Sequence, residues 1–327
     1  MNKFFTLLLL IPAISSAQSF NPAPGNPNSN AIKKDSSCFV SWATGGTITR
    51  GYINISDTTI QASGSNRASF GNLNLALGPA TGSTTDIVSL GDSGVATLSF
   101  DRFIMDGPGY DFAVFENGFT DNYIELAHVE VSSDGVHFFR FPSTTEVPLD
   151  TQMGNASFSD CRMVNNLAGK YRVGYGTPFD LSELPDDTNL DKHAVKFVRI
   201  IDAIGDISGN HYTTDQYGTR INDPFPTPFE SGGFDLEAIG VINGTLGLDE
   251  QSLLNVSAYP NPTKEQITIT LNGQAVLLLY TTDGRLIETR SHFDQTSISL
   301  LDFAPGMYNL VVSQGEHTRI MNIMRVN

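Results

Sequence analysis

The sequence predicts an all-β chain folded into a large β-sandwich followed by a small one. Gly, Ser, Thr, Asn and Asp are abundant, whereas long windows of helix-forming residues are missing. Apolar residues occur in short runs or alternate with polar ones, and turn-forming residues separate them. From residue 255 onward the predicted strands become short and evenly spaced, which indicates a second compact β module.

The centre of the large domain is predicted to be the stretch 106–141. The apolar run 112–115 is typical of a strand that is buried on both faces. Residues 124–131 form a second strand whose alternation slips by one residue, which predicts a β-bulge. Ser133-Asp134-Gly135 is a hairpin turn signal, and 136–141 is the expected return strand.

Three more strands complete the predicted core of this domain, at 95–100, 195–201 and 234–242. Two long loop regions, 142–170 and 203–232, separate them, and loops of this length are often functional. Asp180 is expected to cap one helical turn, with Glu183 at the capping-box position. The predicted boundaries are a signal peptide at 1–17, an extended lead-in at 18–34, the large β-sandwich at 35–243, a linker at 244–254 and the small domain at 255–327.

The first residues have the pattern of a bacterial secretory signal. Lys3 precedes an apolar core, and the small residues 15–17 precede Gln18. No later stretch is apolar enough over about 18 residues to span a bilayer. We therefore expect an exported chain without a transmembrane segment. The formal net charge of −16 argues against nucleic acid or anionic lipid as a partner.

The sequence contains two cysteines, Cys38 and Cys161. Because an exported protein folds in an oxidising compartment, they are expected to form a disulfide bond, with two unpaired thiols as the alternative. The bond would close a long loop and contribute about 4–5 kcal/mol in the chain-entropy description.

The C-terminal 75 or so residues resemble the type A sorting domain of the Bacteroidetes type IX secretion system. The resemblance is carried by Tyr259-Pro260-Asn261-Pro262, by Thr282-Asp283-Gly284-Arg285, by Pro305-Gly306-Met307-Tyr308 and by the final strand 319–327. Arg319 and Arg325 stand where lysine-rich tails are usual. The resemblance implies an immunoglobulin-like β-sandwich, the type IX machinery as a partner, and delivery to the outer cell surface or the medium. A plain immunoglobulin-like domain is the alternative.

The larger domain resembles a family of uncharacterised bacterial cell-surface proteins. The matching segments are 109–117, 129–135 and 233–239. More distantly, the 129–141 hairpin and the strand at 195–200 are similar to discoidin-like, galactose-binding jelly rolls. The resemblance implies a jelly-roll β-sandwich and an association with TonB-dependent uptake components, including those for cobalamin, but it does not identify the ligand.

Catalytic motifs are missing from the sequence, and no catalytic residues are assigned. The chain has no G-x-S-x-G, H-E-x-x-H or C-x-x-C motif. Acidic residues at predicted strand ends and in the loops suit Ca²⁺, which takes six to eight hard oxygen ligands. Turn capping and solvation of loops are the alternative roles for these acids. The candidate metal ligands are Asp111, Glu116, Asp202, Asp215, Asp235 and Glu237.

A ligand-binding surface is predicted on the long loops at one end of the sandwich. Aromatic rings beside polar groups are suited to a ligand that contains a ring, although the same side chains could anchor the loops to the core. Trp42, the single tryptophan, is expected to be a core anchor, with a stacking platform as the alternative. The candidate ligand-binding residues are Trp42, Tyr212, Tyr217, Arg220, Phe225 and Phe229.

These observations predict an exported, non-enzymatic cell-surface binding module that captures a glycan or a nutrient such as cobalamin. Two alternatives remain open at this point. One is a surface hydrolase that acts on glycans with paired carboxylates, which would need two acids about 5–10 Å apart in an open cleft. The other is a calcium-stabilised structural or adhesive protein without a small-ligand pocket.

Overall fold

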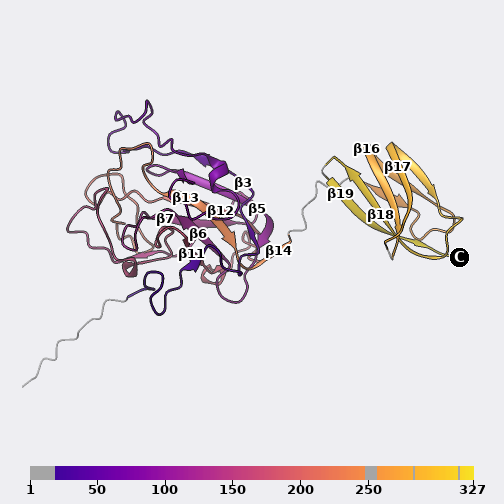
Figure 1. Ribbon diagram of the computed structural model, residues 1–327, viewed down its shortest axis with the longest axis horizontal. Helices are drawn as coiled ribbons and strands as arrows, with labels where there is room; N and C mark the ends of the chain where they lie inside the picture. The colour runs from indigo at the N-terminus through magenta and orange to yellow at the C-terminus, as the bar shows by residue number, and fades with distance from the viewer. Residues whose placement is uncertain (1–18, 247–255, 283, 316) are drawn as a thin grey trace, which may run out of the picture. The chain divides into compact units, whose positions relative to one another are not determined.

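The computed structural model describes residues 19–246, 256–282, 284–315 and 317–327. The predicted signal peptide and most of the predicted linker lie outside these ranges. The chain divides into two compact units, 1–245 and 246–327, and each is described by itself. Unit 1 consists of two layers of antiparallel strands with long connections around them (Figure 1).

The first sheet of unit 1 runs in the order β1-β11-β6-β13-β2, and β4 pairs with the start of β13. The strand β6 is Phe-Ala-Val-Phe-Glu and is buried along its whole length, as the sequence predicts. The strands of this sheet are β1 (Ile32–Lys33), β2 (Ser41–Trp42), β4 (Val88–Ser89), β6 (Phe112–Glu116), β11 (Tyr175–Phe179) and β13 (Asp235–Val241).

The second sheet runs in the order β14-β5-β12-β7-β8, and β3 pairs with β5. Along β5, Ala96, Leu98 and Phe100 are buried while the residues between them are partly exposed, in agreement with the predicted alternation. The strands are β3 (Gly45–Thr49), β5 (Val95–Ile104), β7 (Ala127–Ser132), β8 (Phe139–Arg140), β12 (Val195–Asp202) and β14 (Gly244–Leu246).

The main core lies between the two sheets. Phe112 and Val114 of β6 point into it with Val129 and Val131 of β7, whereas Phe115 points to the opposite face of its sheet. There Phe115 packs against Phe39 and Trp42, with ring centroids 5.7 and 5.6 Å away. The predicted β-sandwich is therefore confirmed, and its first sheet is covered on both faces.

The predicted bulge within 124–131 is wrong. Strand β7 begins at Ala127 and pairs with β12 from Ala127 to Ser132 without a register shift. Ile124 and Leu126 precede the strand and belong to a separate apolar cluster with Val164 and Ile221. The alternation of apolar and polar residues changes phase at this point because the apolar residues 124 and 126 lie in a loop and the strand starts only at Ala127.

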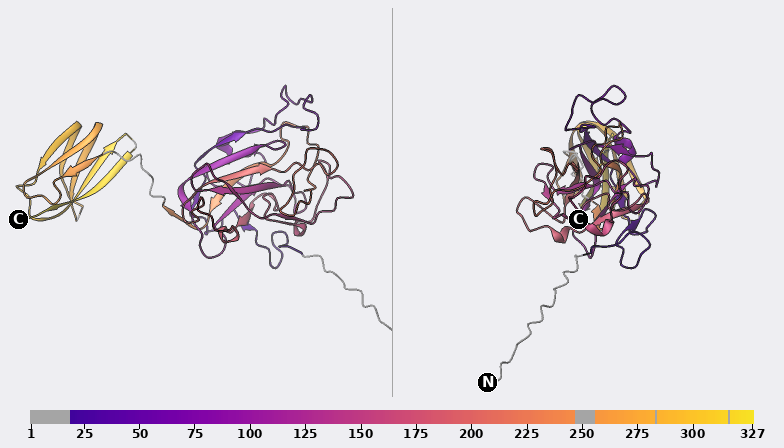
Figure 2. Two further views of the ribbon diagram at one scale, coloured as in Figure 1. Left: turned by 180° about the vertical axis from the view of Figure 1, so that it is seen from behind. Right: turned by 90° about the vertical axis from the view of Figure 1, so that its left-hand side faces the viewer.

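The long loops gather at the end of unit 1 away from β14 (Figures 1 and 2). They contain a two-stranded ribbon and short helical turns. Asp180 accepts a hydrogen bond from Ser182 N at the start of one such turn, which confirms the predicted cap. These elements are β9 (Thr144–Thr145), β10 (Val164–Asn165), η1 (Leu73–Ala76), η2 (Cys161–Met163) and η3 (Leu181–Glu183).

Both ends of the described part of unit 1 are tied to the sandwich. Phe20 N donates to Arg162 O, and Ile32 pairs with Gly176, so the predicted lead-in packs on the domain. Gly244–Leu246 forms the edge strand β14 where the sequence predicts the start of a linker. None of the helical segments in the described ranges is long and apolar enough to span a membrane.

Unit 2 is one antiparallel sheet in the order β15-β16-β18-β19, with β17 paired to β16. Gln266–Thr281 is a single long strand where the sequence predicts short ones, and it has a register shift after Thr270 and a positive φ at Gly273. Its odd-numbered residues face one core along its length. The strands are β15 (Ser257–Tyr259), β16 (Gln266–Thr281), β17 (Leu286–Ser299), β18 (Gly306–Gln314) and β19 (His317–Arg325).

Candidate functional site

Acidic residues from several strands meet at the loop end of the sandwich. Strand β6 ends at Glu116 where its antiparallel neighbour β13 begins at Asp235. Strand β12 ends at Asp202 where its neighbour β7 begins. Because antiparallel strands bring the end of one chain segment beside the start of the next, these acids lie at the same edge of their sheets.

We call the resulting group the acidic cluster. Its six members are at most 7% exposed, and each interacts electrostatically with at least one other member. Three of the metal ligands predicted from sequence, Asp111, Asp215 and Glu237, are not among them, and three other acids join. The members are Asp92, Glu116, Glu125, Asp202, Asp223 and Asp235.

Backbone N–H groups satisfy several carboxylate oxygens of the acidic cluster. Asp202 accepts hydrogen bonds from Phe234 N and Ser93 N at 2.7 and 2.9 Å. Asp223 accepts from Leu126 N at 2.9 Å, and Asp92 from Ile55 N at 2.7 Å. These three acids therefore hold loops against the strand ends, a structural role.

Only one of the two carboxylate oxygens of Glu116, and one of Asp235, accepts a hydrogen bond from the described part of the chain. Glu116 Oε2 accepts from Gly118 N at 2.7 Å, and Asp235 Oδ2 accepts from the Asn117 side chain at 3.1 Å. Their other oxygens, Glu116 Oε1 and Asp235 Oδ1, are buried and accept no hydrogen bond from the described residues. A buried carboxylate oxygen without a partner is costly, so these two atoms need a proton or a cation.

Burial and mutual repulsion make the acidic cluster hard to ionise. Burial, followed by the charge of Asp235, raises the pKa of Glu116 well above its usual range. The pKa of Glu125 is raised by burial and then by Asp235 and Glu116. Burial raises the pKa of Asp235 to about 7, while the neighbouring Ser89 and Asn117 side chains and, after them, the Arg50 guanidinium act in the opposite direction.

Asp111 lies in a different group from the acidic cluster. Asp106, Asp111 and Asp180 each place one carboxylate oxygen within 4.8 Å of those of the other two. Among the described residues, no three members of the acidic cluster are as close as this. Asp111, however, accepts hydrogen bonds from Gly107 N, Leu181 N and the Asn243 side chain. Through these hydrogen bonds Asp111 already holds the neighbouring loops together.

Asp215 and Glu237 also have partners of their own. Asp215 accepts from Thr145 N, Tyr217 N and Thr219 N, so it shapes the 215–219 turn. Glu237 Oε1 accepts from Gly82 N at 2.5 Å, while its buried Oε2 has no described partner. The structure therefore groups three of the six predicted metal ligands, Glu116, Asp202 and Asp235, in the acidic cluster.

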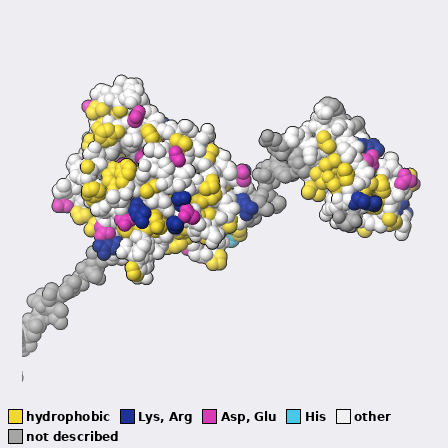
Figure 3. Space-filling view, in the orientation of Figure 1, with side chains coloured by type: hydrophobic (Ala, Val, Ile, Leu, Met, Phe, Trp, Pro, Cys, Tyr) yellow, Lys and Arg dark blue, Asp and Glu magenta, His cyan; other side chains and the backbone are white. Residues whose placement is uncertain are grey.

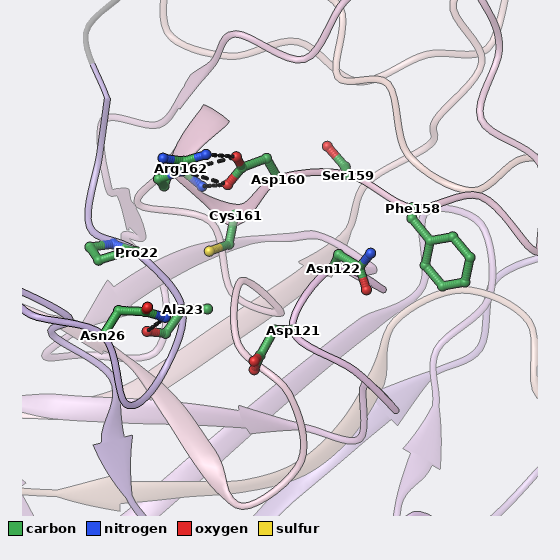
Figure 4. A pocket seen from close by; sticks show the side chains of 10 residues that line it. All are labelled: Pro22, Ala23, Asn26, Asp121, Asn122, Phe158, Ser159, Asp160, Cys161 and Arg162. Carbon is green, nitrogen blue, oxygen red and sulfur yellow. Dashed lines mark hydrogen bonds and ion pairs between the residues drawn. The ribbon is translucent and has the colours of Figure 1, made fainter.

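A cavity of about 610 Å³ lies next to this end of the sandwich (Figure 4). The N-terminal segment forms one side, and the loop ending in η2 forms another. In Figure 4 the Asp160–Arg162 ion pair and Phe158 lie on separate parts of the rim. Its lining residues are Pro22, Ala23, Asn26, Asp121, Asn122, Phe158, Ser159, Asp160, Cys161 and Arg162.

Both acids in this cavity are neutralised by arginines. Asp160 pairs with Arg162, and Asp121 pairs with Arg172 at 2.7 Å. Aromatic rings continue from the cavity rim: Phe158 is 62% exposed, the partly buried Tyr123 lies 6.4 Å from it, and the exposed Phe119 lies 5.6 Å from Tyr123. The cavity thus combines hydrogen-bonding groups of no net charge with flat apolar surfaces.

The predicted aromatic platform is only partly assembled. Arg220 stacks on Tyr212 at 3.7 Å from the ring centroid, and Tyr217 is 75% exposed. Phe225 is buried, with its N–H bonded to Met153 O, and it anchors the loop. Phe229 is partly exposed. Trp42 packs on Phe39 at 4.7 Å, as its interpretation as a core anchor predicts.

Sequence reasoning missed the aromatic group at Phe119, Tyr123 and Phe158. Phe158 comes from the 142–170 loop, which was expected to be functional, but the sequence does not show that it folds beside Tyr123. The predicted disulfide is not formed in the structure, where both cysteines are free. Cys161 is buried in η2 at the cavity, whereas Cys38 lies in the turn between β1 and β2.

His128 occupies a second polar environment, on the outer face of β7. Its Nε2 lies 3.1 Å from Thr214 O, and its Nδ1 lies 3.5 Å from Ser143 Oγ. Burial, assisted by the charge of Arg140, lowers the pKa of His128 to about 4, while Asp215 acts in the opposite direction. His128 is therefore neutral in the folded protein near neutral pH.

Acid should destabilise the sandwich through His128. The folded pKa of about 4 lies below the unfolded value of about 6.5, so protons bind preferentially to the unfolded chain. The stability present above pH 6.5 is lost as the pH falls toward 4, by about 2–3 kcal/mol at pH 4.5. Urea unfolding at pH 7 and 4.5 should show a smaller loss in His128→Gln than in the wild type. His193→Gln, at an exposed position, should match the wild type; equal losses in all three proteins would contradict the assignment.

The C-terminal unit matches a family model. Residues 257–325, which include the strands β15 to β19, match the secretion system C-terminal sorting domain. Unit 2 is a secretion sorting domain. This identification confirms the type IX sorting domain expected from the sequence and indicates that the protein is secreted to the cell surface. The family match does not extend to unit 1.

Solved structures with some similarity to the whole chain superpose poorly on it. A biofilm-associated protein BSP domain is 11% identical, with a TM-score of 0.21 over 90% of this chain and 53% of that chain. The Lactobacillus rhamnosus β-glucuronidase is 12% identical, with a TM-score of 0.20 over 94% and 46%. The Ruminococcus gnavus β-glucuronidase is 9% identical, with a TM-score of 0.19 over 71% and 36%.

The chain thus spans about half or less of the length of these structures. The scores are too low to establish a shared fold. No curated protein matches the chain.

Proposed function

We propose that the protein is an exported cell-surface binding module whose sandwich captures a neutral saccharide in the cavity beside Phe158. The sorting domain accounts for delivery to the surface, and the sandwich is the unit left to bind a ligand. The observation that carries the proposal is the combination of a polar cavity of about 610 Å³ with exposed aromatic rings at its rim. Ligand pockets are typically about 300–1,000 Å³ in volume.

The chemistry of the lining supports a neutral, hydroxyl-rich ligand. Asn26 and Asn122 offer amide donors and acceptors, and the two acid–arginine pairs add charged ones without a net charge. Phe158 and Tyr123 offer apolar faces on which the C–H face of a sugar ring can pack. The formal net charge of −16 disfavours an anionic polymer.

The hydrolase alternative has less support from the same residues. Glu116 and Asp235 are 1% and 6% exposed, so a glycosidic bond has no access to them. Asp121 and Asp160 do line the cavity, but each forms an ion pair with an arginine, which favours the ionised carboxylate over the general acid that glycoside hydrolysis requires.

Calorimetric titration of the full chain with a panel of neutral oligosaccharides tests the proposal. We expect binding by at least one saccharide, and Phe158→Ala should weaken it about tenfold, since an aromatic contact contributes about 0.5–1.5 kcal/mol. Tyr217→Ala is the matched control. Tyr217 is exposed on the 203–232 loop, where the sequence predicts ligand binding, and it does not line the cavity. Its affinity should equal that of the wild type.

Two results would overturn the proposal. One is a saccharide affinity that Tyr217→Ala weakens and Phe158→Ala leaves unchanged, which would move the site to the 203–232 loops. The other is binding of cobalamin with none of the saccharides, which would identify a nutrient-capture protein instead. Thermal unfolding of each variant establishes that the substitution has left the fold intact.

A further inference from the structure

Two further cavities adjoin the cavity beside Phe158, which is called the central cavity from here on. The second cavity, of about 380 Å³, shares the lining residues Phe158, Ser159 and Asp160 with the central cavity. The third cavity, of about 450 Å³, shares Pro22 and Arg162 with it. In the described ranges, the second and third cavities have no lining residue in common. The central cavity therefore lies between the other two.

One segment of the chain runs along all three cavities. Residues 157–160 line the second cavity, 158–162 line the central cavity, and Arg162 lines the third. Figure 4 shows the same order, with Pro22 and Arg162 on one side of the central cavity and Phe158 on the opposite side. The three cavities thus form a continuous row.

Buried hydrogen bonds fix the wall of the second cavity. Asn222 is 2% exposed, and its side chain donates to Pro148 O and Thr151 O at 2.7 and 2.8 Å. The Asn222 side chain also accepts from Met153 N at 3.0 Å. Val147 and Met153, which belong to a buried apolar cluster, give the same wall an apolar surface. The second cavity is therefore preformed, as small-ligand sites usually are.

Hydrogen bonds also hold the N-terminal segment in place as a wall of the third cavity. Phe20 N donates to Arg162 O at 3.0 Å, and the Asn21 side chain donates to Asn28 O at 3.0 Å. The partly buried Phe20 contributes an aromatic face, and the two asparagines contribute polar groups. Each cavity of the row thus combines an apolar surface with hydrogen-bonding groups.

Arg162 is a fixed hydrogen-bond donor at the junction of the central and third cavities. Asp160 accepts from Arg162 backbone N at 2.9 Å and from its Nε and Nη2 at 2.9 and 2.5 Å. The Arg162 side chain is 56% exposed, and none of its hydrogen bonds to the described residues uses Nη1. A ligand hydroxyl can therefore accept from Nη1. At the other junction, the exposed ring of Phe158 offers an apolar face.

We propose that the ligand is a linear saccharide of at least three sugar units, which lies along the row with a unit in each cavity. This inference rests on the proposed function and specifies the class of saccharide. A sugar unit has an apolar C–H face and hydroxyl groups at its edge, which match the two kinds of surface that each cavity offers. Units joined in one chain reach neighbouring cavities at a high effective concentration, so each occupied cavity adds to the affinity. A single sugar would leave two preformed cavities unused.

Calorimetric titration of the full chain with neutral linear oligomers of graded length tests the inference. The probes are α-1,4-linked and β-1,4-linked glucose, β-1,4-linked mannose and β-1,4-linked xylose, each in chains of one to six units. In a series that binds, the affinity should rise by about tenfold or more from one unit to three, and it should level off once the row is filled. The stoichiometry should stay at one chain per protein.

Two substitutions fill the outer cavities from exposed positions. Thr151→Trp places a ring in the second cavity, and Pro27→Trp places one in the third. In each variant the affinity should level off at a shorter chain length, because one cavity is occupied by the added ring. The double variant should bind three units no more tightly than one.

Thr58→Trp is the matched control, because it adds the same ring at an exposed threonine that lines none of the three cavities. The backbone carbonyls of Thr58 and Thr151 both accept a hydrogen bond from an asparagine side chain, so the two positions are similarly held. The control should match the wild type at every chain length. Thermal unfolding of each variant checks that the sandwich remains folded.

The outcomes separate this inference from the proposed function. Saccharide binding that Phe158→Ala weakens, but that does not depend on chain length, would overturn the inference and leave the proposed function standing. A length dependence that the double variant keeps in full would also overturn the inference, because the added units would then bind outside the row. If no series binds at any length, both the proposed function and the inference are wrong.

Discussion

Removal of residues 247–327 should leave the sandwich folded and abolish its appearance on the cell surface. The deletion takes away the whole segment that matches the sorting domain, 257–325. It removes no part of the sandwich core, because the buried apolar residues of the two units form separate clusters. We therefore expect the truncated chain to be made, to fold, and to stay inside the cell.

Surface labelling and protease accessibility of intact cells measure this effect in a bacterium that carries the type IX machinery. Attachment of residues 247–327 to an unrelated exported carrier protein is the positive control, and the carrier should then reach the surface. The purified truncated protein should keep the unfolding midpoint of the sandwich in the full chain. Surface exposure of the truncated chain at the full-length level would contradict the assigned role of unit 2.

Phe112→Ala should cost about 3–5 kcal/mol of the sandwich's unfolding free energy, the range found when a buried phenylalanine is truncated. Phe112 is fully buried between the sheets. Its ring stacks on Phe179 at 5.3 Å and meets Phe141 edge-on at 5.8 Å, so the cavity left behind would remove contacts to both rings. Because Phe112 belongs to a strand buried on both faces, its surroundings have little freedom to collapse.

Trp42 provides the measurement. As the chain's single tryptophan it reports on the sandwich and not on the sorting domain, so urea unfolding of the full chain can be followed by its fluorescence. Phe119→Ala is the matched control, since Phe119 is 63% exposed and its loss should change stability by no more than about 0.5 kcal/mol. Equal effects of the two substitutions would show that Phe112 is not a core residue.

The fold was predictable where the sequence pattern of apolar and polar residues matches their burial in the folded structure. The run 112–115 is apolar at every position because both faces of its strand are covered, and β5 alternates because one of its faces is more open. The prediction failed at Ile124 and Leu126, where a buried loop produces the same alternation as a strand. It also failed around Gly273, where one long strand continues through a register shift although the sequence predicts short strands.

The sites were less predictable because they depend on which loops meet. Glu116 and Asp235 lie at strand ends, where the sequence places them, whereas Glu125 lies in a loop and not in the strand that the sequence predicts for 124–131. The Arg220–Tyr212 contact is within reach of sequence reasoning because the two residues are close in the chain. The contact of Phe158 with Tyr123 joins residues 35 positions apart through a loop, and nothing local in the sequence encodes it.

The burial of the acidic cluster changes how the protein's charge should be understood. The cluster contains six of the chain's 35 acidic residues, and on the face in Figure 3 the exposed acids appear as separate spots among basic and neutral side chains. A buried carboxylate keeps a proton or shares a cation, so these six contribute little to the field outside the molecule. Electrophoretic mobility and retention on an anion exchanger depend on that outer field. The protein should therefore behave in such separations as a less acidic particle than its formal charge of −16 implies.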